Sequence, residues 1–486
     1  MQRANAGGGR SPDLVDRACA AGSFLRSAAL AVLCSCAACE DASVVPPPPL
    51  DSVPPTISVV FPTDTVFDED GDGLVDVRLV LADSGGLVDP TGIRVRSLRG
   101  VNGSAGNDAN LLEYWRVGTR DTAELVFHET IENLLHGGEN RLEIAVPDTA
   151  GNVGTDTVYL SLPHGQLQQT LATGLTYGIA HGIGVVVCPD DDRVYMAAGK
   201  SIVVVDALDP RIIATVEDTT APDNFYLPLC VPGDPVLYVT LRVMRFDRTT
   251  LQWLPRVSPS YLSIGIVQSR ADPNLLYVGE SYTGGVAIID RAQAARIGSL
   301  ALPPAASYPE WVPDLALLAG DTKIYVSRIA DQGILAADPA TGEVSTYIAI
   351  GGPTWPGLGV ADAFVLSHDD RWLYVAILDG DPRGVAVVDT QTDRVVRTLP
   401  LPDYVPQAIA LSPSGNRLFV TTQDRWVSTP SKNVLIDVPG WRVLEEFPRP
   451  RPAGVTRFDG GIAFRGDGKL AFVAHDLDID VYLIRE

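Results

Sequence analysis

One short motif, an aromatic residue between two apolar residues, recurs seven times and constrains the fold of this chain more than any other feature. The aromatic residues follow one another at intervals of 43, 39, 48, 49, 45 and 53 residues. This spacing is typical of a β-propeller in which each repeat forms one four-stranded blade. The seven copies are Val194-Tyr195-Met196, Leu237-Tyr238-Val239, Leu276-Tyr277-Val278, Ile324-Tyr325-Val326, Leu373-Tyr374-Val375, Leu418-Phe419-Val420 and Ala471-Phe472-Val473.

The clearest repeat lies between Asp362 and Leu401. It consists of short segments rich in Val, Ile, Leu and Tyr, and turns containing Gly, Asp and Pro separate them. Such a pattern predicts an antiparallel meander. The four expected strands are residues 363–366, 372–377, 384–389 and 394–399.

An aspartate ends the third predicted strand in six repeats. Aligned carboxylates can indicate catalysis, but each of these residues also begins a hairpin turn, where a short carboxylate can accept a hydrogen bond from the backbone two residues on. We favour the turn role. The six residues are Asp206, Asp247, Asp290, Asp338, Asp389 and Asp437.

The seventh repeat has only three predicted strands, the last of them at residues 481–484. An open ring would expose the edges of its sheets. The segment at residues 166–171, just before the first repeat, is similar to the fourth-strand segment at residues 394–399. We therefore expect an N-terminal strand to close the last blade.

The Tyr-Val strand centres, the turns at residues 412–416 and 338–342, and the repeat spacing resemble the YVTN-type bacterial β-propellers. The resemblance covers about residues 165 to 486. It implies an all-β, seven-bladed propeller with four-stranded blades over residues 164–486, and it says little about chemistry, because such propellers serve as binding scaffolds, lactonases, lyases and redox subunits. Blade two departs from the pattern, since residues 243–246 lack a glycine-rich lead-in.

Residues 1–36 have the features of an export signal. Arg17 and Arg26 precede an apolar run at residues 27–36 that is too short to span a bilayer. Leu33-Cys34-Ser35-Cys36 resembles a bacterial lipobox, which would make Cys36 the lipidated residue, and Cys39 is the weaker candidate. An ordinary cleaved signal is the alternative.

Two further regions precede the propeller. Residues 37–55 contain a run of four prolines, which predicts a semi-rigid tether. Residues 56–163 contain six short alternating segments, which favour a β-sandwich. The segments at residues 138–142 and 146–152 resemble the closing strands of bacterial immunoglobulin-like domains, which act as spacers or adhesive units outside the cell.

One acidic motif predicts a metal site. Asp68, Asp70, Asp72 and Asp76 occupy positions one, three, five and nine of a loop of the EF-hand type, with Gly73 at position six. Position twelve is a leucine, so the bidentate carboxylate is missing and affinity for calcium should be weak. Calcium is the only cofactor that the sequence suggests, and an acidic turn between two strands is the alternative.

Other metal and haem sites are not expected. None of the six histidines forms a closely spaced helical zinc pair, and the Cys-Ala-Ala-Cys segment at residues 36–39 is followed by glutamate rather than histidine. Beyond the Cys-Ala-Ala-Cys segment only Cys188 and Cys230 remain, and both end the innermost strands of neighbouring blades. An exported protein can keep a disulfide there, and two buried free thiols are the alternative.

The formal net charge is −23 at pH 7, which disfavours nucleic acid and anionic lipid as partners. Contact with a membrane is expected only through a lipid anchor, at the outer membrane, the cell surface or in the periplasm. The expected partner is a protein or glycan at the cell envelope.

One aromatic residue per blade lies in the loop that leads into the innermost strand, and these loops gather at the mouth of a propeller channel. Their rings could stack on sugars, anchor a protein partner or pack between blades. We predict a non-catalytic binding scaffold. The alternatives are an enzyme of the lactonase or lyase class, with His181 at the channel mouth, and a purely structural envelope protein. The seven residues are Tyr177, Tyr226, Tyr261, Trp311, Trp355, Tyr404 and Phe458.

Overall fold

The structure is a computed structural model in which strands dominate from Asp51 onward. Within the described residues no helix has the length and apolar character needed to cross a membrane. Residues outside the description are 1–50, 62–73, 85–87, 90–91, 100–103, 110–113, 118–121, 131–138, 162, 176–183, 222–226, 241, 258–262, 281–282, 301, 305–311, 313, 329–332, 351–360, 378–381, 424–431, 449–458, 476–477 and 486.

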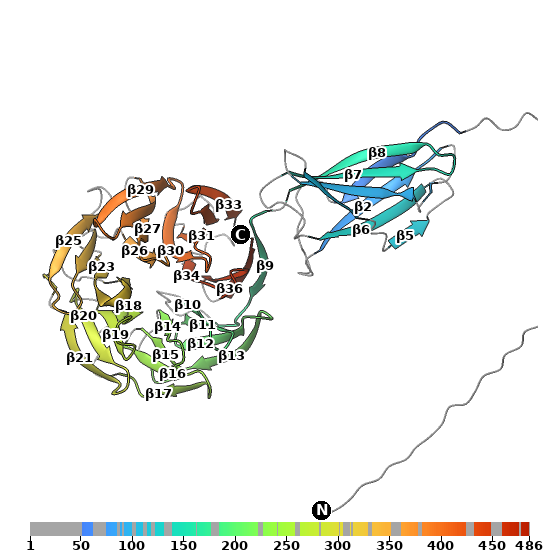
Figure 1. The fold of residues 1–486 in the computed structure, drawn as a ribbon. Coiled ribbons are helices and arrows are strands. Elements are labelled where there is room, and N and C mark those ends of the chain that lie inside the picture. Colours follow the sequence, from blue (N-terminus) through green and yellow to red (C-terminus); the bar gives the residue numbers. More distant parts are fainter. Residues whose placement is uncertain are drawn as a thin grey trace, which may run out of the picture. The chain divides into compact units, whose positions relative to one another are not determined.

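Eight strands between residues 56 and 161 form two four-stranded antiparallel sheets (Figure 1). Alternate residues are buried on one strand of each sheet, namely Leu79 and Leu81 on β2, and Leu142 and Ile144 on β7. Two of the eight strands were not predicted, because β4 is poor in β-branched and aromatic residues and β5 is only four residues long. The first sheet has the order β1 (Thr56–Phe61), β2 (Leu74–Ala82), β6 (Thr122–Thr130), β5 (Tyr114–Val117), and the second has the order β4 (Ser104–Ala109), β3 (Arg94–Arg99), β7 (Glu139–Pro147), β8 (Val153–Ser161).

The remaining strands form seven four-stranded antiparallel sheets that surround one axis as the blades of a propeller (Figure 1). The predicted seven-bladed propeller is confirmed. Blade 1 contains β10 (Val185–Cys188), β11 (Arg193–Ala198), β12 (Ser201–Asp206) and β13 (Arg211–Glu217); blade 2 contains β14 (Pro228–Cys230), β15 (Val236–Val239), β16 (Met244–Asp247) and β17 (Gln252–Leu254); blade 3 contains β18 (Ser263–Gln268), β19 (Leu275–Glu280), β20 (Val286–Asp290) and β21 (Ala295–Leu300).

Blades 4 to 7 follow the same order from the axis outward. Blade 4 contains β22 (Leu315–Leu317), β23 (Ile324–Arg328), β24 (Gly333–Ala337) and β25 (Val344–Ala349), with the short 3₁₀ helix η3 (Ala319–Asp321) after β22; blade 5 contains β26 (Ala361–Leu366), β27 (Trp372–Ile377), β28 (Gly384–Asp389) and β29 (Arg394–Pro400); blade 6 contains β30 (Val405–Leu411), β31 (Arg417–Gln423), β32 (Lys432–Asp437) and β33 (Arg442–Pro448); blade 7 contains β34 (Asp459–Phe464), β35 (Leu470–His475), β36 (Asp478–Ile484) and β9 (Gly165–Leu171).

The ring closes through the strand that the sequence predicts. β9 pairs antiparallel with β36, from Ile479 opposite Leu171 to Ile484 opposite Gly165. Figure 1 shows β9 along the outer edge of β36. The two ends of the propeller are thus joined by a sheet ladder, which leaves no unpaired edge at β36.

The propeller core lies between blades. Seven clusters of buried apolar side chains occur, one at the junction of each pair of neighbouring blades. The repeated aromatic residue of the second strand belongs to these clusters, and Tyr195, Tyr325 and Phe419 are fully buried there. The sequence motif therefore recurs because each blade must present one large side chain to a neighbour.

The aligned aspartates serve the turns between the third and fourth strands, as predicted. In each of these turns a carboxylate oxygen accepts hydrogen bonds from backbone N–H groups two or three residues on, for example from Leu208 and Asp209 to Asp206. The fourth residue after the aspartate has a positive φ in five blades. These five residues are Leu251, Ala294, Gly342, Asp393 and Trp441.

The outermost strands share a second irregularity. The ladder between the third and fourth strands skips one residue in every blade except blade 2. Such a β-bulge bends the outer edge and makes it a poor template for pairing with another chain. In blade 5 the bulged residue is Val396, whose side chain is 53% exposed.

Candidate functional site

Most of the side chains that the sequence singles out for function lie outside the described residues. This holds for six of the seven loop aromatics, for the lipidation candidate, for three of the four calcium-loop aspartates and for the histidine of the enzyme alternative. They are Tyr177, Tyr226, Tyr261, Trp311, Trp355, Phe458, Cys36, Asp68, Asp70, Asp72 and His181.

Tyr404, the seventh loop aromatic, is half-buried and packs against the apolar cluster between blades 5 and 6. The Nζ atom of Lys432 lies 5.7 Å from the centre of its ring. Burial raises the pKa of Tyr404, and its interaction with Glu446 acts in the same direction. Tyr404 therefore packs between blades and also interacts with the charged pair Lys432 and Glu446.

Asp76, the last residue of the expected calcium loop, lies in β2 opposite His128. A different acidic group comes from three separate parts of the sequence. Asp51, Asp83 and Asp148 each offer a carboxylate oxygen, and these oxygens lie within 4.8 Å of one another. Oxygen ligands of this kind suit a hard cation such as Ca²⁺.

Asn152 orders this acidic group. Its Nδ2 atom donates hydrogen bonds to the Asp148 carboxylate at 2.7 Å and to the backbone oxygen of Asp51 at 3.1 Å. Desolvation acts to raise the pKa of Asp148, but the hydrogen bonds from Asn152 and the following backbone outweigh it, so that pKa is lowered. Asp148 therefore keeps its negative charge, as a cation ligand must.

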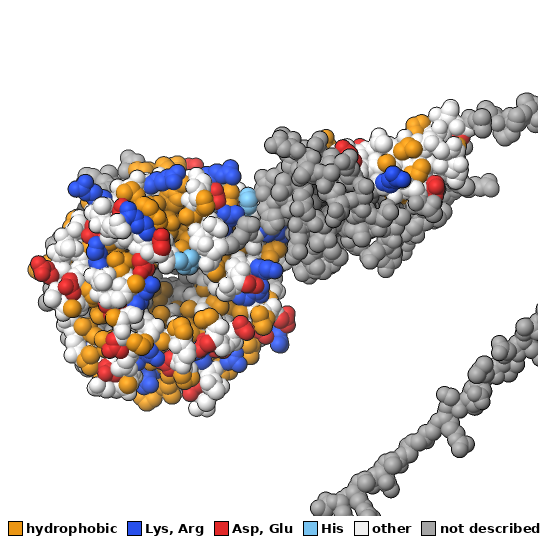
Figure 2. All heavy atoms as spheres, viewed as in Figure 1, with side chains coloured by type: hydrophobic (Ala, Val, Ile, Leu, Met, Phe, Trp, Pro, Cys, Tyr) orange, Lys and Arg blue, Asp and Glu red, His pale blue; other side chains and the backbone are white. Residues whose placement is uncertain are grey.

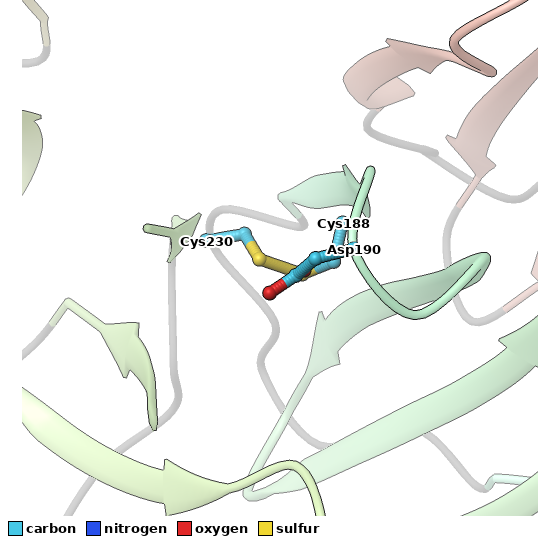
Figure 3. Close-up of side chains that lie close together, drawn as sticks. All are labelled: Cys188, Asp190 and Cys230. Atoms are coloured by element: carbon cyan, nitrogen blue, oxygen red, sulfur yellow. A yellow bond between two sulfur atoms is a disulfide. The ribbon is translucent and has the colours of Figure 1, made fainter. Parts of the chain in front are cut away.

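Cys188 and Cys230 form a disulfide between β10 and β14, the innermost strands of blades 1 and 2 (Figure 3). Their Cα atoms are 5.6 Å apart. The carboxylate of Asp190 lies beside the two sulfur atoms in the same figure. Because both sulfur atoms are used in the bond, this group of residues is a covalent link between blades and not a metal site.

The same junction contains a buried guanidinium. Arg248 follows β16 of blade 2, is 4% exposed, and donates to Asp190 and Asp191 of blade 1 at 2.8 Å. The hydroxyl of Tyr195 also donates to Asp191, at 2.7 Å. Burial acts to lower the pKa of Arg248, but its bonds to both carboxylates raise it overall. These residues make the junction between blades 1 and 2 a closed, ion-paired contact.

A pocket of about 340 Å³ lies at the junction between blades 5 and 6. Volumes of this size accommodate small-molecule ligands. Blade 5 contributes strands β27, β28 and β29, and blade 6 contributes the turn between β32 and β33. The residues that line it are Trp372, Tyr374, Val387, Val396, Arg397, Val438, Pro439 and Trp441.

Aromatic rings and one guanidinium define this pocket. The rings of Tyr374 and Trp441 are stacked, with their centres 6.1 Å apart and an angle of 27° between their planes. The guanidinium of Arg397 lies 5.5 Å from the Trp441 ring, and that of Arg371 lies 4.9 Å from the Trp372 ring. Arg371 is also bonded to Asp389 at 2.6 Å, whereas Arg397 has no carboxylate partner among the described residues.

A buried acid in blade 3 has a raised pKa, a property that is frequent among catalytic acids. Glu280 is 4% exposed, and burial raises its pKa. Both of its oxygens accept hydrogen bonds from Arg296 of the same blade, at 2.7 and 3.2 Å. This pairing offsets part of the desolvation of the carboxylate and gives Glu280 a structural partner.

No family model matches this chain, and no curated protein matches it either. The pocket was not predicted, because its lining residues belong to two repeats and each has an ordinary place in its own repeat. An unusual residue type at two repeat positions could have indicated the pocket. Trp441 occupies the turn position at which blade 4 has Gly342, and Val438 occupies the position at which blade 2 has Arg248.

Proposed function

We propose that this protein is an exported, non-catalytic binding propeller that holds a protein or glycan ligand at the cell envelope. In this proposal Cys36 carries a lipid anchor, residues 37–55 are a tether, and residues 56–163 are an immunoglobulin-like spacer. The propeller of residues 164–486 is the part that binds.

The pocket between blades 5 and 6 is the observation that carries the proposal. Three aromatic side chains, Trp372, Tyr374 and Trp441, line a volume of about 340 Å³. Pockets of this kind, mostly apolar with few polar groups, are typical of ligand binding. Tyr374 has no hydrogen-bonding partner for its hydroxyl within the part of the chain that the structure describes, so the pocket provides stacking surfaces rather than an activated acid or base.

The disulfide between Cys188 and Cys230 supports export. Disulfides persist in the periplasm and outside the cell, and are rare in the reducing cytosol. The two four-stranded sheets between residues 56 and 161 support a sandwich spacer that precedes the propeller in the sequence. The acidic group of Asp51, Asp83 and Asp148 would let calcium stiffen that spacer.

A binding survey tests the proposal. The purified protein would be applied to arrays of glycans and envelope proteins, with calcium and with a chelator. We expect saturable binding of at least one ligand, and no turnover of lactone substrates. Lactone hydrolysis or lyase activity without any saturable binding partner would refute it and favour the enzyme alternative.

A further inference from the structure

We propose that the pocket between blades 5 and 6 binds one uronic acid residue of an acidic glycan. This inference rests on the proposed function, because it names the ligand class of a propeller that is already taken to be a binding module. Figure 2 shows hydrophobic side chains together with Lys and Arg side chains over this part of the ring. The two chemical needs of a uronate ring are an apolar surface and a cation beside it.

The aromatic walls meet the first need. One face of a pyranose ring presents C–H groups, and such a face stacks on the π surface of an aromatic side chain. Tyr374 and Trp441 are 4% and 7% exposed and stack on each other, so they form a fixed apolar base of the pocket, and the half-buried Trp372 supplies the ring surface that a ligand can reach. A site with preset rings loses little conformational entropy on binding.

Arg397 meets the second need. It lies on β29 with an exposed side chain, and its guanidinium is held against the Trp441 ring. Several other guanidinium groups of the blades are paired within the chain, as in the pairs of Arg248 with Asp190 and of Arg371 with Asp389. Arg397 is available to a ligand carboxylate, which it can bind through two parallel hydrogen bonds.

The net charge of the chain is the reason that the guanidinium of Arg397 indicates the kind of ligand. With 60 acidic and 37 basic residues, the protein has a net negative charge that disfavours the approach of anions. A guanidinium without a carboxylate partner, beside an aromatic pocket, therefore favours an anionic ligand at one place. A neutral sugar would use the rings alone.

Trp441 occupies a backbone position that is unfavourable for its type. Its φ is +50°, and the equivalent residue of blade 4 is Gly342 with φ +76°. Bulky residues rarely adopt this left-handed conformation. Its indole N–H is also buried and has no hydrogen-bond partner among the described residues. The same turn position has a positive φ in five blades, so the conformation belongs to the turn type, and in blade 6 it sets an indole ring at the pocket wall.

The test uses D-glucuronate as the probe and D-glucose as its neutral counterpart, with the purified full-length protein. Binding would be followed by saturation-transfer NMR and by tryptophan fluorescence. For a ligand of this size we expect a Kd on the order of 1 mM for glucuronate. Glucose should bind about tenfold more weakly, because it lacks the charge-assisted hydrogen bonds.

Three variants locate the site. Arg397→Gln should weaken glucuronate binding about tenfold and leave glucose unchanged, and Trp441→Gly should weaken both while relaxing the turn. Arg394→Gln, on the same exposed strand but outside the pocket lining, is the matched control and should bind as the parent does.

Each contrary result has a distinct meaning. If glucuronate does not bind, or binds equally well to Arg397→Gln, the uronate site is refuted, and the proposed function stands as long as the arrays give another ligand. If an acidic peptide competes for the pocket and glucuronate does not, the occupant is a protein and the glycan assignment is wrong. If no array ligand binds at all, the proposed function fails as well.

Discussion

Two junctions of the same propeller use the same repeat in opposite ways. Between blades 1 and 2, a disulfide and the buried Arg248 close the contact. Between blades 5 and 6, the position of Arg248 is taken by Val438, and aromatic side chains surround a pocket. A propeller fold is thus compatible with either a sealed or an open junction, and the residue after the third-strand aspartate is one of the positions at which the two junctions differ.

The aspartate four residues before the second-strand tyrosine responds to this difference. In blades 1 and 2, where the next blade supplies Arg248 or Arg291, Asp191 and Asp234 bond both that arginine and their own tyrosine. In blade 5 the equivalent Asp370 instead accepts hydrogen bonds from residues of preceding blades, namely from Arg270 of blade 3 and from the backbone N–H of Ala319 in blade 4.

In blade 1 the carboxylate of Asp191 fixes the hydroxyl of Tyr195, whereas in blade 5 the equivalent Asp370 is bonded elsewhere and does not fix the hydroxyl of Tyr374. Tyr374 stacks on Trp441 instead. The comparison teaches that a pocket can arise in a repeat protein when an inter-blade charge pair is not formed, without any change in strand order.

Removal of the disulfide should have the largest effect on stability. The bond closes a segment with a sequence separation of 42 residues, and loss of that constraint costs about 4 kcal/mol by the chain-entropy estimate. We expect the double variant Cys188→Ala/Cys230→Ala to unfold at a clearly lower denaturant concentration. Equilibrium unfolding with and without reductant checks this. Glucuronate binding should persist in folded protein, and its loss would mean that the two junctions are coupled.

Removal of the buried guanidinium should be the next largest effect. Arg248→Met leaves Asp190 and Asp191 without their cation, but these carboxylates are 32% and 24% exposed and can regain water. We therefore expect a loss of about 2 to 3 kcal/mol, below the full cost of orphaning a buried charge. The control is Arg397→Met, whose exposed side chain should contribute less than about 1 kcal/mol. Equal losses in chemical denaturation would remove the contrast between the junctions.

Conversion of the open junction into a closed one is a more specific test. Val438→Arg puts a guanidinium where Arg248 stands in blade 2, close to Asp370 of blade 5 by repeat alignment. We expect the new side chain to fill the pocket and to abolish glucuronate binding, with a stability change within about 1 kcal/mol, because the new ion pair offsets the lost apolar contacts. Val438→Ala should keep the pocket open and retain binding. Titration calorimetry would measure glucuronate binding by both variants. Unchanged binding by Val438→Arg would contradict the idea that this position keeps the junction open.

The fold could be predicted because its signals are local and repeated. The strands at residues 372–377 and 384–389 occur with the predicted bounds, and the closing strand could be inferred because an open sheet edge is costly. The role of Asp206 and its five counterparts followed from the hydrogen-bonding reach of a short side chain.

The pocket could not be predicted in the same way. It depends on Trp372 of one blade and Trp441 of the next, and their proximity is a property of how the blades pack. The same applies to the acidic group, since Asp51 and Asp148 are almost a hundred residues apart in the sequence. Spacing within one repeat or one loop gives no information about either contact.

Acid sensitivity should be the smallest difference between the two junctions. The hydrogen bond from Arg248 lowers the pKa of Asp190 below its ordinary value of 3.8, against the opposing effect of burial. A lowered folded pKa contributes stability that is complete above about pH 4 and is lost as the pH falls through the folded pKa. Because Asp190 is about one-third exposed, we expect less than about 1 kcal/mol from this residue. We would measure Tm between pH 6 and pH 3. Over this range Tm should decrease slightly less for Asp190→Asn than for the parent protein. Val438→Ala, which changes no charge, is the control and should show the same pH dependence of Tm as the parent. A steeper decrease for Asp190→Asn would contradict the assignment of this carboxylate as the partner of Arg248.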